Sequence, residues 1–170
     1  MFFRKKEKEL PWMVAGKAVF GMHEVKDNAV LKQWLRSDGK TLGDPKALPW
    51  CGDYVETCIR NSLPREPFPG KLGENPYWAR NWLYFGLRVE PCYGCVMVFK
   101  RGSGGHVGFG VGEDATDYYV LGGNQSNAVN ITRISKDRCL GATWPKTFDK
   151  PTKRLTKMKA GSIPRTTNEF

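Results

Sequence analysis

The sequence predicts an α+β domain in which helices come first and pack on one face of a small antiparallel sheet. Three observations indicate this fold class. The chain has 170 residues, the size of one ordinary domain with a single core. Its residues are 40% hydrophobic and 12% aromatic, which excludes disorder for most of the chain. Apolar residues recur at helical spacing in the first half and alternate along short runs in the second.

Four segments have the helical pattern: 11–21, 29–37, 50–61 and 77–85. Pro11 lies in the first turn of the first segment, and Asp27-Asn28 is a suitable cap for the second. Loops rich in Gly and Pro separate the later helices. Four β-rich runs follow, joined by turns rich in Gly, Asn or Ser, and predict an antiparallel meander: 95–100, 106–113, 117–121 and 128–135.

The formal net charge of +10 lies mainly at the two ends of the chain. Residues 1–10 carry +2 and residues 146–170 carry +5, which leaves +3 for residues 11–145. We therefore expect a basic N-terminal arm, one domain over 11–145 and a basic C-terminal tail, with both ends solvated. A basic surface of this kind favours an acidic partner.

The N-terminus lacks the features of a signal peptide, because Arg4-Lys5-Lys6 follows only three residues and the later run 12–20 contains Lys17. No stretch approaches the roughly 20 apolar residues of a transmembrane helix. We expect a chain made in the cytoplasm with no transmembrane segment. Work outside the cytoplasm would need another factor for release.

The chain has five cysteines, so a complete set of intramolecular disulfides would leave one thiol over. Cys92 and Cys95 have the spacing of a zinc or redox pair, but no second pair follows and the chain has only two His. We predict two partly buried thiols at the entrance of a strand, and no metal or other cofactor.

Cys51 follows Pro49-Trp50 at the predicted start of the third helix. The unsatisfied N–H groups and the dipole of a helix start stabilise a thiolate, which suits a nucleophile. Cys51 also lies on one helical stripe with Val55 and Cys58, so a buried cysteine without chemistry is an equally good interpretation of this position alone.

His106 opens a strand in which it shares one face with Gly108 and Gly110. Glycines on one face indicate close approach of another element, and the Cys51 helix is the one we expect there. That packing would bring His106 beside the thiol. The imidazole would then accept the thiol proton and later protonate a leaving amine.

The next strand ends in Gly122-Gly123-Asn124-Gln125, and antiparallel pairing returns this end to the start of the His106 strand. Asn124 is therefore predicted to accept from the second ring nitrogen of His106 and orient the ring. Gln125 is the competing candidate for this position. A turn without a catalytic role is the remaining interpretation.

Pro49-Trp50-Cys51, the run from Gly104 to Phe109, and Gly122 to Gln125 together resemble the CHAP family of cysteine, histidine-dependent amidohydrolases and peptidases. The likeness covers residues 11–145 and is strongest to the single-domain endolysins of phages. It implies a papain-like fold of the CHAP or NlpC type and cleavage of an amide bond of bacterial peptidoglycan for host lysis. The bond lies between stem-peptide residues or between muramic acid and L-alanine.

The resemblance assigns Cys51 as nucleophile, His106 as general base and acid, and Asn124 as the orienting residue, with Trp50 and Gln125 expected to contact substrate. Asp53 departs from the family pattern, and a solvent-facing side chain is its simplest interpretation. The calcium loop of some CHAP domains has no match before Cys51. We expect a monomer that acts on peptidoglycan in the periplasm or cell wall, with basic ends that bind anionic envelope polymers or lipopolysaccharide.

Two other function classes remain open. One is a non-catalytic or structural virion protein of the same fold. The other is a nucleic-acid-binding protein, which fits poorly because only Phe148 and Phe170 are interleaved with the charges of the tail. Loss of activity on substitution of Cys51 would separate an enzyme from both.

Overall fold

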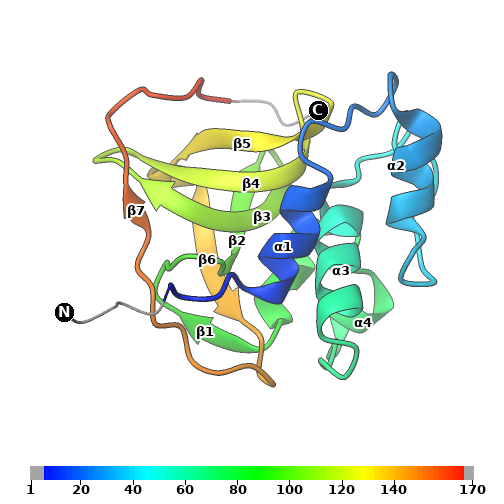
Figure 1. Ribbon diagram of the computed structural model, residues 1–170, viewed down its shortest axis with the longest axis horizontal. Coiled ribbons are helices and arrows are strands. Elements are labelled where there is room, and N and C mark those ends of the chain that lie inside the picture. Colours follow the sequence, from blue (N-terminus) through cyan, green and yellow to red (C-terminus); the bar gives the residue numbers. More distant parts are fainter. Residues whose placement is uncertain (1–5, 167–170) are drawn as a thin grey trace.

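The computed structural model describes residues 6–166, in which helices pack on one side of a twisted sheet (Figure 1). The helices come first: α1 (Pro11–Ala18), α2 (Asn28–Leu35), α3 (Cys51–Ser62), α4 (Lys71–Glu74) and the 3-10 helix η1 (Ala79–Tyr84). The strands follow, with a short 3-10 helix η2 (Lys136–Arg138) between the fifth and sixth: β1 (Leu87–Val89), β2 (Val96–Arg101), β3 (Gly104–Glu113), β4 (Asp117–Gln125), β5 (Ala128–Ser135), β6 (Cys139–Trp144) and β7 (Thr156–Lys157). This order confirms the predicted α+β class. None of the described helices is long and apolar enough to cross a membrane.

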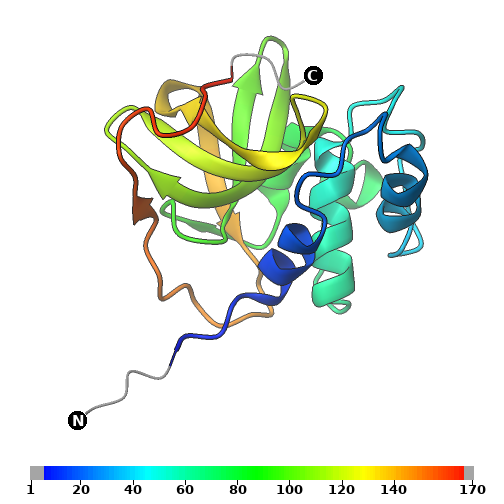
Figure 2. The same ribbon diagram turned by 45° about the horizontal axis from the view of Figure 1, so that its top comes forward.

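α3 is the central helix, and every residue from Cys51 to Ile59 is buried. α1 packs closely on it, because a Cβ on Gly16 would lie 2.5 Å from the hydroxyl of Tyr54. The Tyr54 ring also contacts Phe109 of β3, with ring centroids 6.2 Å apart. Figure 2 shows α3 between the sheet and α2. Contacts on several sides therefore fix the start of α3 and, with it, Cys51.

The helix expected over residues 77–85 is the 3-10 helix η1 and starts at Ala79. Its buried side chains are Ala79, Trp82 and the following Phe85, three residues apart. A 3-10 helix has three residues per turn, so this geometry aligns all three toward the core. The indole of Trp82 also donates to the carbonyl of Pro76 at 2.8 Å, which fixes the chain before η1.

The sheet has the strand order β1-β6-β2-β3-β4-β5, with every pair antiparallel, and β7 pairs with β3 in parallel. β2 to β5 are the four predicted strands, although β4 continues to Gln125. β1, β6 and β7 were not predicted. β6 inserts between β1 and β2, so Thr143 pairs with Val96 far away in the sequence.

Gly108 and Gly110 of β3 are packed by elements other than α3, which corrects the packing expected for these two positions. A Cβ on Gly108 would meet Val120 of β4 at 2.6 Å, and one on Gly110 would meet Leu155 at 3.2 Å. The glycines therefore admit the neighbouring strand and the C-terminal segment rather than the helix.

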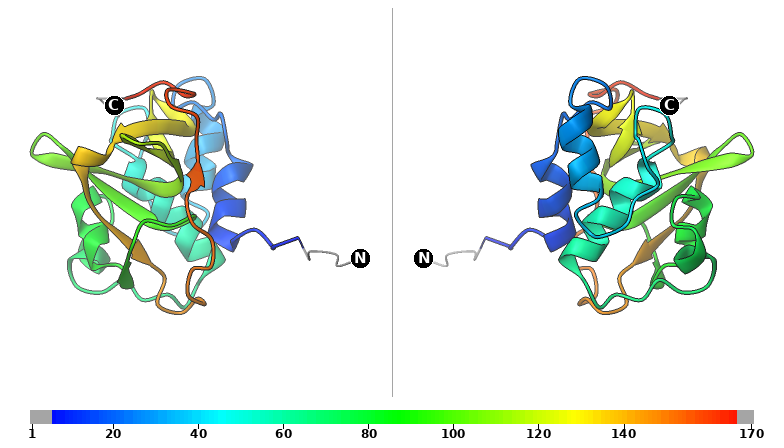
Figure 3. Two further views of the ribbon diagram at one scale, coloured as in Figure 1. Left: turned by 90° about the vertical axis from the view of Figure 1, so that its left-hand side faces the viewer. Right: turned by 90° about the vertical axis from the view of Figure 1, so that its right-hand side faces the viewer.

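The C-terminal segment is part of the fold and not a solvated tail, as far as it is described (residues 146–166). Figure 3 shows it crossing the side of the sheet, where β7 adds to β3. Leu155 is 4% exposed, and the Arg165 guanidinium binds the buried Asp117 carboxylate at 2.7 and 2.8 Å. The N-terminal arm is also anchored, because Glu9 binds Lys17 and Tyr93. Residues 1–5 and 167–170 of the predicted arms lie outside the described residues.

Candidate functional site

Cys51 is the first residue of α3 and is 3% exposed. Trp50 occupies the cap position, and no side chain caps this end of the helix. The N–H groups and the dipole of a helix start favour a thiolate or an oxyanion. The backbone of Pro76 and Tyr77 lies directly against the helix start, because a Cβ on Gly52 would clash with the Pro76 carbonyl oxygen.

His106 is fully buried near the start of β3, and its Nε2 lies 2.9 Å from Oε1 of Gln125. The Gln125 amide nitrogen donates to the carbonyl oxygens of Val120 at 3.1 Å and Asn130 at 2.8 Å. These two acceptors fix which end of the amide faces His106, so Oε1 accepts and Nε2 of the imidazole donates. In the neutral ring, Nδ1 is then the nitrogen that accepts a proton.

The structure places Gln125 beside His106 and so corrects the prediction for Asn124. The pairing of β4 with β5 shifts between Gly122 and Gln125, and Asn124 has the positive φ of 57°. This left-handed residue turns the chain, and the side chain that reaches His106 comes from the next position. Asn124 is 3% exposed, and its Nδ2 is buried without a hydrogen-bond partner.

Trp50 and Gln125 were expected to contact substrate, but their side chains are each 1% exposed. The Trp50 indole donates to Glu24 at 2.8 Å, and its ring packs over Gly123, where a Cβ would lie 2.6 Å from Cζ3. Gln125 uses its amide on His106 and two carbonyls. Both side chains are therefore engaged inside the protein, Trp50 in packing and Gln125 in hydrogen bonds.

Gly122 and Gly123 of β4 link the two predicted catalytic residues. A Cβ on Gly122 would lie 3.5 Å from Nε2 of His106, and the adjacent Gly123 contacts Trp50, which precedes Cys51. A side chain at Gly122 would displace Gln125, whose Oε1 lies 2.6 Å from the Cβ position, and a side chain at Gly123 would displace the Trp50 ring. The close approach of Cys51 Sγ to the His106 ring stays a prediction.

Asp53 is buried and does not point to solvent, which corrects the interpretation from the sequence. Its Oδ2 accepts hydrogen bonds from the hydroxyl of Thr41 at 2.9 Å and the backbone N–H of Leu42 at 3.0 Å, so it holds the 41–42 loop on α3. Burial raises the pKa of Asp53 to about 7, and the negative charge of Glu56 acts in the same direction, against the two hydrogen bonds.

Trp78 is an exposed aromatic residue near the candidate site that the sequence did not single out. Its side chain is 46% exposed, and its Cη2 lies 3.8 Å from the Cβ position of Gly104 at the start of β3. Arg80 donates to the Gly104 carbonyl at 2.8 Å and holds the same strand end. An exposed aromatic ring beside this strand suits contact with substrate. The residue types alone do not distinguish it from the buried Trp50 and Trp82.

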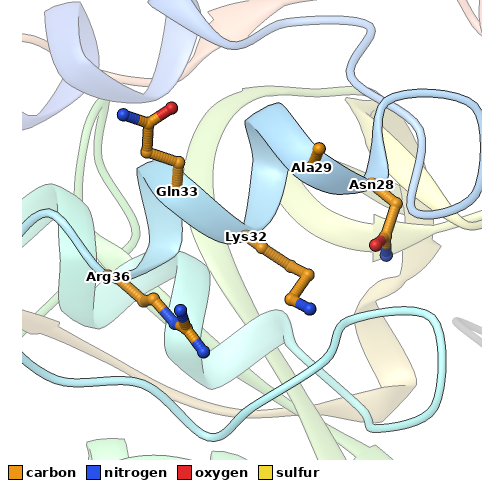
Figure 4. A pocket seen from close by; sticks show the side chains of 5 residues that line it. All are labelled: Asn28, Ala29, Lys32, Gln33 and Arg36. Carbon is orange, nitrogen blue, oxygen red and sulfur yellow. The ribbon is translucent and has the colours of Figure 1, made fainter.

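Among the described residues, α2 and α3 each line a surface hollow. The first, about 370 Å³, is lined by α2; Figure 4 shows Asn28, Lys32 and Arg36 pointing to one side of the helix and Gln33 to the other. Asn28 and Lys32 both contact Asp44, so this hollow already contains a counter-charge. The second, about 430 Å³, lies between residues 39–41, residues 73–77 and α3, which contributes Glu56 and Arg60.

Cys92 and Cys95 lie immediately before β2, as predicted, but both are buried rather than partly buried, and the backbone N–H of Cys92 donates to Sγ of Cys95 at 3.4 Å. Within residues 6–166, no group of three or more His, Cys, Asp or Glu side chains is arranged to hold a metal ion. Comparison of the chain with protein-family models, with curated proteins and with solved structures finds no match.

Proposed function

We propose that this chain is a papain-like cysteine hydrolase that cleaves an amide bond of bacterial peptidoglycan. Cys51 is the nucleophile, His106 the base and acid, and Gln125 the residue that positions His106. The observation that carries the proposal is the 2.9 Å contact between His106 Nε2 and Gln125 Oε1, which leaves Nδ1 as the proton acceptor of a buried imidazole. A histidine with only a structural role would not require that the Gln125 amide be held in one orientation by the carbonyl oxygens of Val120 and Asn130.

In the proposed reaction, Nδ1 of His106 accepts the thiol proton and the Cys51 thiolate attacks the carbonyl carbon of the amide. The uncapped N–H groups at the start of α3 stabilise the oxyanion of the tetrahedral intermediate. The imidazolium then protonates the leaving amine as the C–N bond breaks, which leaves a thioester on Cys51. Water, deprotonated by His106, hydrolyses the thioester and releases a carboxylic acid.

The basic surface brings the enzyme to the anionic envelope in this proposal. Besides Arg165, which binds Asp117, six basic residues of the C-terminal segment are exposed although the segment is packed: Lys146, Lys150, Lys153, Arg154, Lys157 and Lys159. Because these charges are exposed on a folded segment, replacing Lys146, Lys150 and Lys153 with Gln should weaken binding to whole sacculi at low salt. Hydrolysis of a soluble muropeptide should be unchanged, and an equal loss on both substrates would contradict the targeting role.

Purified protein added to permeabilised Gram-negative cells and to isolated peptidoglycan tests the proposal. Clearing of the cells and release of new amino groups are expected from the wild type, and Cys51→Ala should abolish both. The matched control is Cys58→Ala, because Cys58 is a buried cysteine of the same helix whose pKa is raised by burial. A folded Cys51→Ala protein with wild-type activity would overturn the assignment. The assignment would also be overturned if Cys58→Ala abolished activity to the same extent as Cys51→Ala.

A further inference from the structure

Cys92 and Cys95 are two free thiols at the two ends of one tight turn before β2. The backbone N–H of Cys95 donates to the carbonyl of Cys92 at 3.2 Å, which closes a four-residue β-turn. Gly94, at the third position, has the φ of 82° that is typical of a type II turn. The Cα atoms at the ends of a β-turn lie less than about 7 Å apart, and disulfides join Cα atoms at about 4.4–6.8 Å. The turn therefore brings the two cysteines within the range of a disulfide bond.

The side chains of the two cysteines contact each other and differ in reactivity. The backbone N–H of Cys92 donates to Sγ of Cys95 at 3.4 Å, so this sulfur lies over the start of the turn. A hydrogen bond between the two thiols lowers the pKa of Cys92, and the same bond, together with burial, raises the pKa of Cys95 well above its usual value. Cys92 is 8% exposed and Cys95 is fully buried. Cys92 is therefore the thiol that ionises more readily and that a reagent reaches first.

Hydrogen bonds to other elements hold the turn in this conformation. The N–H of Gly94 donates to the Gly110 carbonyl of β3 at 2.8 Å, and the N–H of Gly110 donates to the Cys95 carbonyl at 2.9 Å. The indole of Trp12 in α1 donates to the carbonyl of Gly94 at 2.8 Å. Because the backbone is already within range, a disulfide needs rotation of two side chains and no change of the fold.

Other pairings of the cysteines fit the fold less well. Cys139 of β6 pairs with Phe99, whereas Cys95 lies four residues before Phe99 in the sequence. Four residues of a strand span about 13 Å, which is beyond the reach of a disulfide. Cys51 and Cys58 both belong to α3 and lie seven positions apart, about 10 Å along the helix axis. The fold therefore favours the pair at the turn over these two combinations.

We infer that Cys92 and Cys95 form a reversible disulfide when the folded chain meets an external disulfide such as oxidised glutathione. The Cys92 thiolate attacks one sulfur of the external disulfide, whose S–S bond breaks, and the departing thiolate takes up a proton. Cys95 then loses its proton and attacks the Cys92 sulfur, which releases the second external thiol. Two electrons pass from the two cysteines to the oxidant, so one external disulfide becomes two thiols.

The closed turn should stabilise the folded chain, because a disulfide restricts the unfolded state. For so short a loop we expect Tm to rise by about 4–8 °C. Cytosolic thiols keep cysteine pairs reduced, whereas the periplasm oxidises them, so the release of the chain that we propose would also close the turn. The disulfide site itself does not depend on the proposed function, and its test involves no peptidoglycan.

Incubation of the folded wild type with oxidised glutathione, followed by alkylation and digestion with trypsin, tests the site. Cleavage after Arg88 and Lys100 yields one peptide, residues 89–100, whose only cysteines are Cys92 and Cys95. We expect this peptide to become lighter by two hydrogen atoms and to take up no alkyl group. Dithiothreitol should restore both thiols and return Tm to the value of the reduced protein.

Two variants test the order in which the thiols react. Cys95→Ser should stop at a mixed disulfide between Cys92 and glutathione, whereas Cys92→Ser should leave the buried Cys95 unmodified. Cys139→Ser is the matched control outside the turn and should oxidise like the wild type. A mixed disulfide on Cys95 in the folded Cys92→Ser protein would overturn this order.

The wild-type measurement decides the site even where a variant does not fold. A peptide 89–100 that keeps two alkylatable thiols, or that becomes linked to a different cysteine peptide, would overturn the disulfide. A disulfide that forms without a rise in Tm would overturn its stabilising role.

Discussion

Replacement of Gln125 with Met should damage catalysis much more than removal of the Asn124 side chain. Met has a similar length, but it offers no acceptor to His106 Nε2 and no donor to the carbonyls of Val120 and Asn130. Loss of ring orientation should lower kcat by roughly 100-fold, equivalent to about 2.7 kcal/mol in the barrier. KM should not change, because Gln125 is 1% exposed and does not reach substrate.

The same replacement should also destabilise the fold. Two backbone carbonyl oxygens lose their donor, and each such loss costs about 1–2 kcal/mol, so we expect a decrease of about 2–4 kcal/mol in the free energy of unfolding. Urea titration measures this change, and amine release from peptidoglycan under conditions where both proteins are folded gives kcat and KM.

The control is Asn124→Gly, which tolerates the φ of 57° and removes a side chain whose Nδ2 has no partner. Its kcat should stay within about threefold of wild type. The opposite pattern, a large loss of kcat in Asn124→Gly and little in Gln125→Met, would refute the assignment of the positioning residue. A rise in KM with unchanged kcat in Gln125→Met would place Gln125 in substrate binding instead.

Three further predictions concern pH, packing and substrate contact. The pKa of Asp53 is about 7 in the folded protein, compared with an ordinary value of 3.8, so the folded state holds the carboxyl proton more tightly than the unfolded state. The free energy of unfolding should therefore fall on the order of 2–4 kcal/mol as pH rises from about 4 to 7. Urea titrations at pH 5 and pH 7.5 should show this fall to be smaller in Asp53→Asn, and an identical fall would exclude Asp53 as its source. Leu155→Ala should cost about 2–4 kcal/mol because Leu155 is 4% exposed, whereas a change below about 0.5 kcal/mol would mean that the C-terminal segment is not packed in solution. Trp78→Ala should raise KM for polymeric peptidoglycan by about tenfold, near 1.4 kcal/mol, without changing Tm, and an unchanged KM would remove Trp78 from the binding surface.

The strands that the sequence predicts are those that pair with the strand next to them in the sequence. β2 to β5 form a meander in which each strand pairs with the next, so local alternation and turn residues are enough to find them. β6 and β7 depend on long-range pairing. Thr156 and Lys157 form a strand only because they pair with Gly112 and Glu113 of β3. No local sequence pattern indicates this pairing.

The sequence identifies which residues belong to the candidate site, but it does not show in which direction their side chains point. Cys51 at a helix start and His106 near the start of a strand follow from Pro49-Trp50 and from the alternation of β3. The choice between Asn124 and Gln125 depends on a register shift within β4, and the sequence shows only two adjacent amides. The burial of Asp53 and Trp50 depends on the 41–42 loop and on Glu24, which are distant or irregular partners.

Mass spectrometry of peptidoglycan digested by the wild type and by Cys51→Ala tests the central claim most directly. We predict that the wild type produces fragments with one new amino end and one new carboxyl end at a single type of amide bond, and that folded Cys51→Ala produces none. Fragments cut at a glycosidic bond, or the same new ends from Cys51→Ala, would contradict a cysteine amide hydrolase built on Cys51.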